Sequence, residues 1–167
     1  GIGELATRRL IDDGCRRILC LRSNSRMRMP ANKRTDAYLD VVEQAGLSAL
    51  VREVEFVKPD DEKGAVVAKI LDENPDIDGI FAGDDTMAAI CLNVMKQRGL
   101  SAPDDIKVVG ADGARRTMTF MPDLTTVRQD IDRIGELAAQ SIIALINGDN
   151  PESNIKLPVE LIEGKTA

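Results

Sequence analysis

The chain contains no histidine and no tryptophan, and its aromatic residues are three phenylalanines and one tyrosine. Without an imidazole it cannot build a Ser-His-Asp or Cys-His nucleophile pair, an HExxH zinc helix or a histidine proton shuttle. No nucleophile with an orienting base stands out among the other residues. We therefore expect that the protein is not an enzyme.

Cysteine is scarce as well, because Cys15, Cys20 and Cys91 are odd in number and lack CxxC spacing. This pattern argues against a disulfide framework and a zinc site, and predicts buried free thiols in a reducing cytoplasm. No apolar run approaches the ~20 residues of a membrane span. The net charge of −6 disfavours direct binding to nucleic acid phosphates. We expect a cytoplasmic protein with no metal, no cofactor and no membrane partner.

Short apolar runs typical of strands alternate along the chain with segments of helical periodicity. The chain has the length of one domain with a sizeable core. Expected strands cover 17–21, 51–57, 77–82, 106–110, 124–127 and 155–162, and expected helices cover 4–12, 32–46, 65–71, 85–98 and 130–147. This order predicts an α/β fold, a Rossmann-like and mainly parallel sheet flanked by helices on both faces. Pro158 predicts an edge position for the last strand.

Polar side chains follow three of these apolar strands, at the point where each strand ends. Asp84 follows Phe81-Ala82-Gly83, Asp112 follows Val108-Val109-Gly110-Ala111, and Gln129 follows the run 124–127. Because the carboxyl ends of parallel strands line one crevice, we expect the three side chains to converge on a small polar ligand. Asp85, directly before Thr86, is in a position to cap the next helix.

Two other interpretations of the same residues remain open. The run Gly110-Ala111-Asp112-Gly113 is half of a dinucleotide fingerprint, but it lacks the GxGxxG spacing that opens a helix. Asp84, Asp85 and Asp112 together are the type of acidic group that holds magnesium beside a phosphoryl-transfer site. A magnesium-dependent phosphoryl-transfer enzyme is therefore the enzyme alternative.

Five motifs in order resemble the effector domain of the LacI/GalR family of bacterial transcription repressors, over nearly the whole chain. They are Leu5-Ala6-Thr7 through Gly14-Cys15-Arg16-Arg17-Ile18, 34–38, Asp84-Asp85-Thr86-Met87-Ala88, Val108-Val109-Gly110-Ala111-Asp112, and Leu124-Thr125-Thr126-Val127-Arg128-Gln129. The resemblance departs at Cys15, where the family has histidine, and at Ala37, where it has glycine.

The resemblance implies one lobe of a type I fold like that of periplasmic binding proteins. Residues 1–129 and 148–167 would form the C-terminal effector-binding lobe, and 130–147 a crossover helix of the missing N-terminal lobe. The DNA-binding helix-turn-helix would also be absent. The implied function is to sense a sugar or related effector and to control DNA binding allosterically, as a homodimer that reaches operator DNA only through the absent domain.

Particular residues take roles by the same resemblance. The implied ligand-binding residues are Arg34, Phe56, Asp84, Asp112 and Gln129. The implied dimer face comprises the helix 86–98 and a loop at 117–121, with Met87, Cys91, Met118, Phe120 and Met121. The alternative with the same fold is a periplasmic sugar-binding protein of a transporter, against which the three free cysteines argue.

Overall fold

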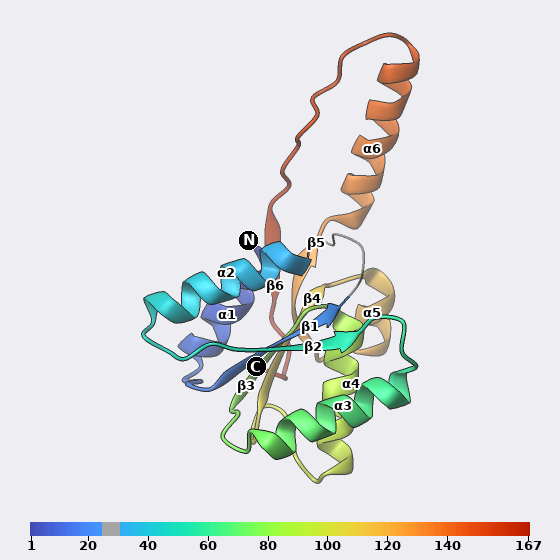
Figure 1. Ribbon diagram of the computed structural model, residues 1–167. Coiled ribbons are helices and arrows are strands. Elements are labelled where there is room, and N and C mark those ends of the chain that lie inside the picture. The colour runs from blue at the N-terminus through green and yellow to red at the C-terminus, as the bar shows by residue number, and fades with distance from the viewer. Residues whose placement is uncertain (25–30) are drawn as a thin grey trace.

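The computed structural model describes residues 1–24 and 31–167, which form a six-stranded sheet with helices on both faces (Figure 1). The strands are β1 (Ile18–Asn24), β2 (Leu50–Glu55), β3 (Gly79–Ala82), β4 (Lys107–Asp112), β5 (Thr125–Gln129) and β6 (Val159–Ile162). The helices are α1 (Ile2–Asp12), α2 (Ala31–Gln44), α3 (Asp60–Glu73), α4 (Asp85–Gln97), α5 (Arg115–Phe120) and α6 (Ile131–Ile146). The strand order is β2-β1-β3-β4-β5-β6.

Neighbouring strands from β2 to β5 run parallel, and only β6 pairs antiparallel with β5. The predicted α/β class and mainly parallel sheet are confirmed. The edge position that Pro158 predicted is also confirmed, because β6 is the last strand in the order. The strand itself is shorter than predicted: it begins at Val159, directly after the proline, which has no N–H to contribute to the ladder.

The two faces of β1 belong to two different hydrophobic clusters. Ile18 and Cys20 pack with buried residues of α1 and α2, whereas Leu19 and Leu21 pack with α3 and α4. Successive side chains of a strand point to opposite faces, so a strand covered by helices on both sides is apolar throughout. All four residues of β3 are likewise buried. This double cover explains why the central strands read as continuous apolar runs in the sequence.

Helices α1 and α2 approach each other closely at Gly3. A Cβ at this position would lie 2.0 Å from the backbone oxygen of Arg34 in α2, so only glycine allows this packing. Tyr38, fully buried, then ties α2 to the sheet: its hydroxyl donates to the Ile18 carbonyl at 2.7 Å and accepts from the Leu50 N–H at 2.9 Å. These contacts fix the position of the helix that carries Arg34.

The chain reverses its direction of travel across the sheet between β1 and β3. It moves from β1 outward to β2, and then returns to place β3 on the other side of β1. In open parallel sheets such a switch point leaves a crevice at the carboxyl ends of the two strands, where ligands bind. Ser23 and Asn24 end β1 here, and Asp84 lies two residues beyond the last residue of β3.

The structure departs most from the predicted helices at α3 and α5. Helix α3 begins at Asp60 rather than Ala65, so that Asp60 and Asp61 lie in its first turn, where their charges oppose the helix dipole favourably. Residues 117–121 were expected to form a loop, but 115–120 form the short helix α5. A helix of six residues is too short to show a clear apolar period, which is why the pattern did not reveal it.

Helix α6 and the segment that returns from it extend away from the rest of the molecule (Figure 1). None of the residues of α6 is buried, although the helix is rich in isoleucine and leucine. Ile142 and Ile143 are each 58% exposed, and Ile146 is 78% exposed. None of the described helices is both long and apolar enough to cross a lipid bilayer.

Candidate functional site

Arg34, Asp112 and Gln129 meet at the carboxyl ends of β4 and β5. Asp112 Oδ1 accepts from Arg34 Nη2 at 2.6 Å and from Gln129 Nε2 at 2.7 Å. Arg34 Nη1 also donates to the carbonyl of Gly83 at the end of β3. The side chain of Arg34 is 15% exposed and that of Asp112 is 31% exposed. Three residues that are far apart in sequence thus form one connected group at the rim of the sheet.

Asp84 lies beside this group at the start of α4, and its two carboxylate oxygens accept different hydrogen bonds. Its Oδ1 accepts from the backbone N–H of Met87 at 2.8 Å, so Asp84 is the N-cap of the helix. Its Oδ2 accepts from the hydroxyl of Ser23, at the end of β1, at 3.3 Å. We did not predict Ser23, although a serine directly after the apolar run of β1 is the same signal that identified Asp84.

The capping role predicted for Asp85 is therefore wrong, because Asp84 caps the helix instead. Asp85 is 3% exposed and faces inward. Its Oδ1 accepts from the hydroxyl of Thr126 at 2.6 Å, and its Oδ2 from the backbone N–H of Gly113 at 2.8 Å. Burial raises the pKa of the Asp85 carboxyl, and the bonds from Thr126 and Gly113 oppose that rise. The sequence favoured Asp85 as the cap, and only the packing against β4 and β5 shows that Asp85 is buried and Asp84 caps the helix.

Phe56 follows β2 at the same end of the sheet, and its backbone N–H donates to the Asn24 carbonyl at 3.0 Å. Its side chain is 54% exposed, and the ammonium group of Lys63 lies 5.8 Å from the ring centroid. The aromatic ring is accessible at the rim but, within the part of the chain that the structure describes, it makes no cation–π contact with Arg34.

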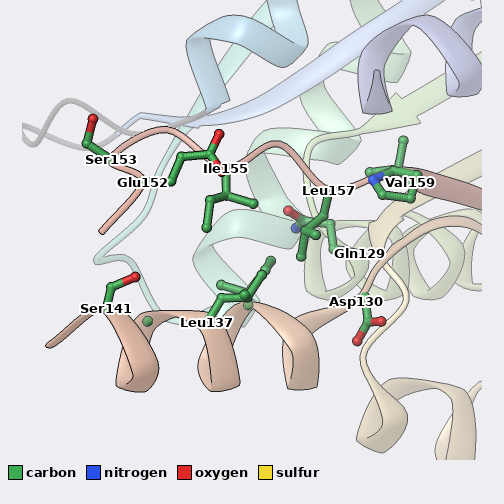
Figure 2. Close-up of a pocket in the computed structure, with 12 residues that line it drawn as sticks. Gln129, Asp130, Leu137, Ser141, Glu152, Ser153, Ile155, Leu157 and Val159 are labelled. Atoms are coloured by element: carbon green, nitrogen blue, oxygen red, sulfur yellow. The ribbon is translucent and has the colours of Figure 1, made fainter. Parts of the chain in front are cut away.

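A groove of about 430 Å³ runs beside this rim, between α6 and the segment that returns from it. Figure 2 shows Leu137 and Ser141 of α6 pointing toward Ile155 and Leu157 of the returning segment, with Gln129 at one end. Gln129, the last residue of β5, and Asp130, the N-cap of α6, thus form the junction between the sheet and α6.

The chemistry of the rim suits an uncharged molecule with several hydroxyl groups. Within residues 1–24 and 31–167, Asp112 Oδ2 accepts no hydrogen bond, so the carboxylate keeps capacity to accept from a ligand. Arg34 adds donors held in one plane. No group of three or more histidine, cysteine or acidic residues is arranged to hold a metal ion in the described part of the chain. The inward orientation of Asp85 removes it from the acidic group on which the magnesium alternative depended.

Comparison with known proteins agrees with this architecture. Residues 7–167 match the family model of the periplasmic binding protein-like domain. The sucrose operon repressor of Lactococcus lactis subsp. lactis is 33% identical over 162 residues, which cover 97% of this chain and 49% of that protein. The chain belongs to the LacI/GalR family of transcriptional regulators.

Two other members of the family are similar over most of this chain. The ribose operon repressor of Halalkalibacterium halodurans is 31% identical over 98% of this chain and 49% of its own length. A LacI-family regulator from Arthrobacter sp. FB24, solved in complex with lactose, superimposes with a TM-score of 0.83 at 26% identity, covering 98% of this chain and 62% of that one. The chain spans about half the length of the curated relatives it matches.

The curated relatives named above are operon repressors and not enzymes, in line with the prediction made for this chain. The prediction of buried free thiols is confirmed, since Cys15, Cys20 and Cys91 are all free and buried. Burial raises the pKa of Cys15 to about 11, and that of Cys20 and of Cys91 to about 12. None of the three thiols is poised to react at neutral pH.

The residues predicted for a dimer face divide into two groups. Phe120 is 75% exposed, and Met118 and Met121 are partly exposed. Met87 and Cys91 are instead in this chain's own core, at 2% and 0% exposure, so the prediction that they contact a partner is wrong. Both lie on the inward face of α4, and helical spacing alone does not tell which face of an apolar helix packs on the sheet.

Proposed function

We propose that this chain is the effector-sensing part of a LacI-type transcriptional regulator in the cytoplasm, and that its effector is a sugar. The observation that carries the proposal is the connected group of Arg34, Asp112 and Gln129, with Asp84 beside it, at the carboxyl ends of the sheet. Carboxylates that accept and a guanidinium that donates together match the hydroxyl groups of a sugar ring. Relatives that are repressors of sucrose and ribose operons, and one solved with lactose, support the choice of ligand class.

The intact regulator, in this proposal, adds two segments to the chain. One is an N-terminal lobe that covers α6 and the groove beside it, so that 130–147 is a crossover helix and 1–129 with 148–167 the second lobe. The other is the DNA-binding domain, through which alone the regulator contacts its operator. Effector bound between the lobes would favour one closure state and so change the spacing of the DNA-binding domains, a coupling of typically ~1 to 3 kcal/mol.

Sugar binding tests the proposal directly. The intact regulator is titrated with sucrose, ribose and lactose by calorimetry, alongside its Asp112→Gly variant. Glycine removes the carboxylate and tolerates the backbone at this position, where φ is 105°. We expect at least one sugar to bind, and the variant to bind it about tenfold or more weakly, as the loss of a charge-assisted hydrogen bond implies.

The matched control is Asp123→Ala, because Asp123 is an exposed acid at the opposite end of β5, paired with Lys165 at 2.8 Å. It should leave the affinity unchanged. A sugar affinity that is equal in wild type and Asp112→Gly would refute the role of this rim, and absence of binding by all three sugars would refute the ligand class tested.

Dimerisation is the second part of the proposal, and the exposed apolar side chains of α5 support it. Phe120 at the end of α5 is 75% exposed, Met118 and Met121 near it in the chain are partly exposed, and we propose that a second copy of the chain covers Phe120. We expect the intact regulator to sediment as a dimer, and Phe120→Asp to shift it toward monomer. A dimer of unchanged stability in that variant would place the interface elsewhere.

A further inference from the structure

Asp85 connects three segments of the candidate site without touching the rim itself. It is the first residue of α4, directly after Asp84, and its carboxylate is buried against β4 and β5. Its two oxygens receive Gly113 N–H at 2.8 Å and Thr126 Oγ1–H at 2.6 Å. Gly113 immediately follows Asp112, and Thr126 lies three residues before Gln129 on β5. The residue is thus bonded to the loop directly after β4 and to β5, next to Asp112 and on the strand that carries Gln129.

The backbone at Asp112 requires such support. Its φ is 105°, a region that L-residues other than glycine rarely adopt and that costs free energy unless the surroundings hold it. Gly113 N–H belongs to the peptide plane that begins at the Asp112 carbonyl. Holding this N–H therefore restricts the backbone of Asp112, and with it the direction of its side chain.

The neighbouring residues leave room for this arrangement. A Cβ at Gly110 in β4 would lie 2.6 Å from Asp85 Oδ1, so any larger residue at position 110 would displace the carboxylate. A Cβ at Gly113, where φ is 58°, would lie 2.6 Å from the Cβ of Arg128. Two glycines thus bring the loop after β4 close enough to Asp85 and β5 for the hydrogen bonds to form.

We propose that Asp85 is a positioning residue for effector recognition, which holds Asp112 in its strained backbone conformation through Gly113 N–H and so aligns it with Arg34 and Gln129. This inference rests on the proposed function for its biological meaning, because Asp112 is the residue expected to contact the sugar. The alignment itself exists without a ligand, and can be measured without one.

The side-chain amide of Gln129 provides the readout. It donates to Asp112 Oδ1 at 2.7 Å, so its proton chemical shifts in the NMR spectrum of this chain report that bond. In the Asp112→Gly variant the Gln129 amide has lost this acceptor, so its chemical shifts give the reference position for the unbonded amide. We expect Asp85→Ala to move the Gln129 signal most of the way toward that position. Thr126→Val, which removes one of the two bonds and is less disruptive to folding, should move it in the same direction by less.

Two variants separate positioning from a general loss of structure. Thr125→Val is the matched control: Thr125 is buried on the same strand, but its hydroxyl bonds with Gly164 N–H and the Ala167 carbonyl instead. It should leave the Gln129 signal in place. Asp85→Asn should restore the wild-type signal, because the amide oxygen accepts from Gly113 while its NH₂ donates to Thr126, whose hydroxyl can accept as well as donate.

The proposal is overturned if Asp85→Ala or, should that variant not fold, Thr126→Val leaves the Gln129 signal at its wild-type position, or if Thr125→Val moves it as far. A signal that Asp112→Gly does not move would overturn it too, since the reported bond would then be absent. Sugar titration of the same variants in the intact regulator distinguishes the two claims. If wild type binds no sugar but the NMR shifts follow this order, the proposed function fails and the positioning role of Asp85 stands.

Discussion

The strand β3 is apolar throughout and the helix α6 is rich in aliphatic residues, yet β3 is buried and α6 is not. Every residue of β3 is buried between helices on the two faces of the sheet. No residue of α6 is buried, and Ile142, Ile143 and Leu145 are each more than half exposed. The comparison teaches that an apolar pattern indicates that a segment needs cover, but does not identify what covers it.

The largest expected effect on stability comes from a substitution in the sheet. Phe81, fully buried in β3, packs against the α1 and α2 side of the core, and Phe81→Ala should lower the free energy of unfolding by about 3–5 kcal/mol. Chemical denaturation measures it, with Val57→Ala as the control because Val57 is 87% exposed. Similar values for the two variants would contradict the buried position of β3.

A smaller effect on stability is expected at Asp85, whose carboxyl group is buried in the core. Its pKa is raised above the ordinary value of 3.8, chiefly by burial. The folded state then binds more protons than the unfolded state between pH 3.8 and the folded pKa, so stability falls as pH rises through this window.

The asparagine of the Asp85→Asn variant cannot ionise, so this variant does not lose stability in the same way as the pH rises. Relative to wild type it should therefore become more stable as the pH rises through the window, and the difference should stay constant below pH 3.8, where the carboxyl group is protonated in both states. Thermal unfolding of both proteins between acid and neutral pH tests this. A difference in melting temperature that does not change with pH would show that the carboxyl group titrates alike in both states.

The smallest effect on the stability of this chain is expected from a substitution in α6. Ile142 is 58% exposed, so Ile142→Ser should change the stability of this chain by no more than about 0.5 kcal/mol. In the intact regulator the same substitution should cost several times more, because the proposed N-terminal lobe covers this face. Denaturation of both forms supplies the two numbers, and equal effects in the two would mean that α6 remains uncovered.

The rim of the sheet shows how far pattern reasoning extends to a site. Asp84, Asp112 and Gln129 were identifiable because a polar residue after an apolar run marks a strand end, and all three lie at the same rim. The pairing of Asp112 with Arg34 was not identifiable from the pattern, because it depends on the position of α2. That position depends in turn on the contact between Gly3 and Arg34, 31 residues apart in the chain.

The amino-acid order by itself determined the α/β class, the mainly parallel sheet and the family, since these follow from local periodicity and from short motifs in sequence. Tertiary structure alone decided which of Asp84 and Asp85 caps α4 and which is buried, and which apolar residues of α4 face the core. The physical reason is that capping, burial and pairing depend on distances between segments that are remote in the chain. Such distances are set by the packing of the whole sheet and its helices.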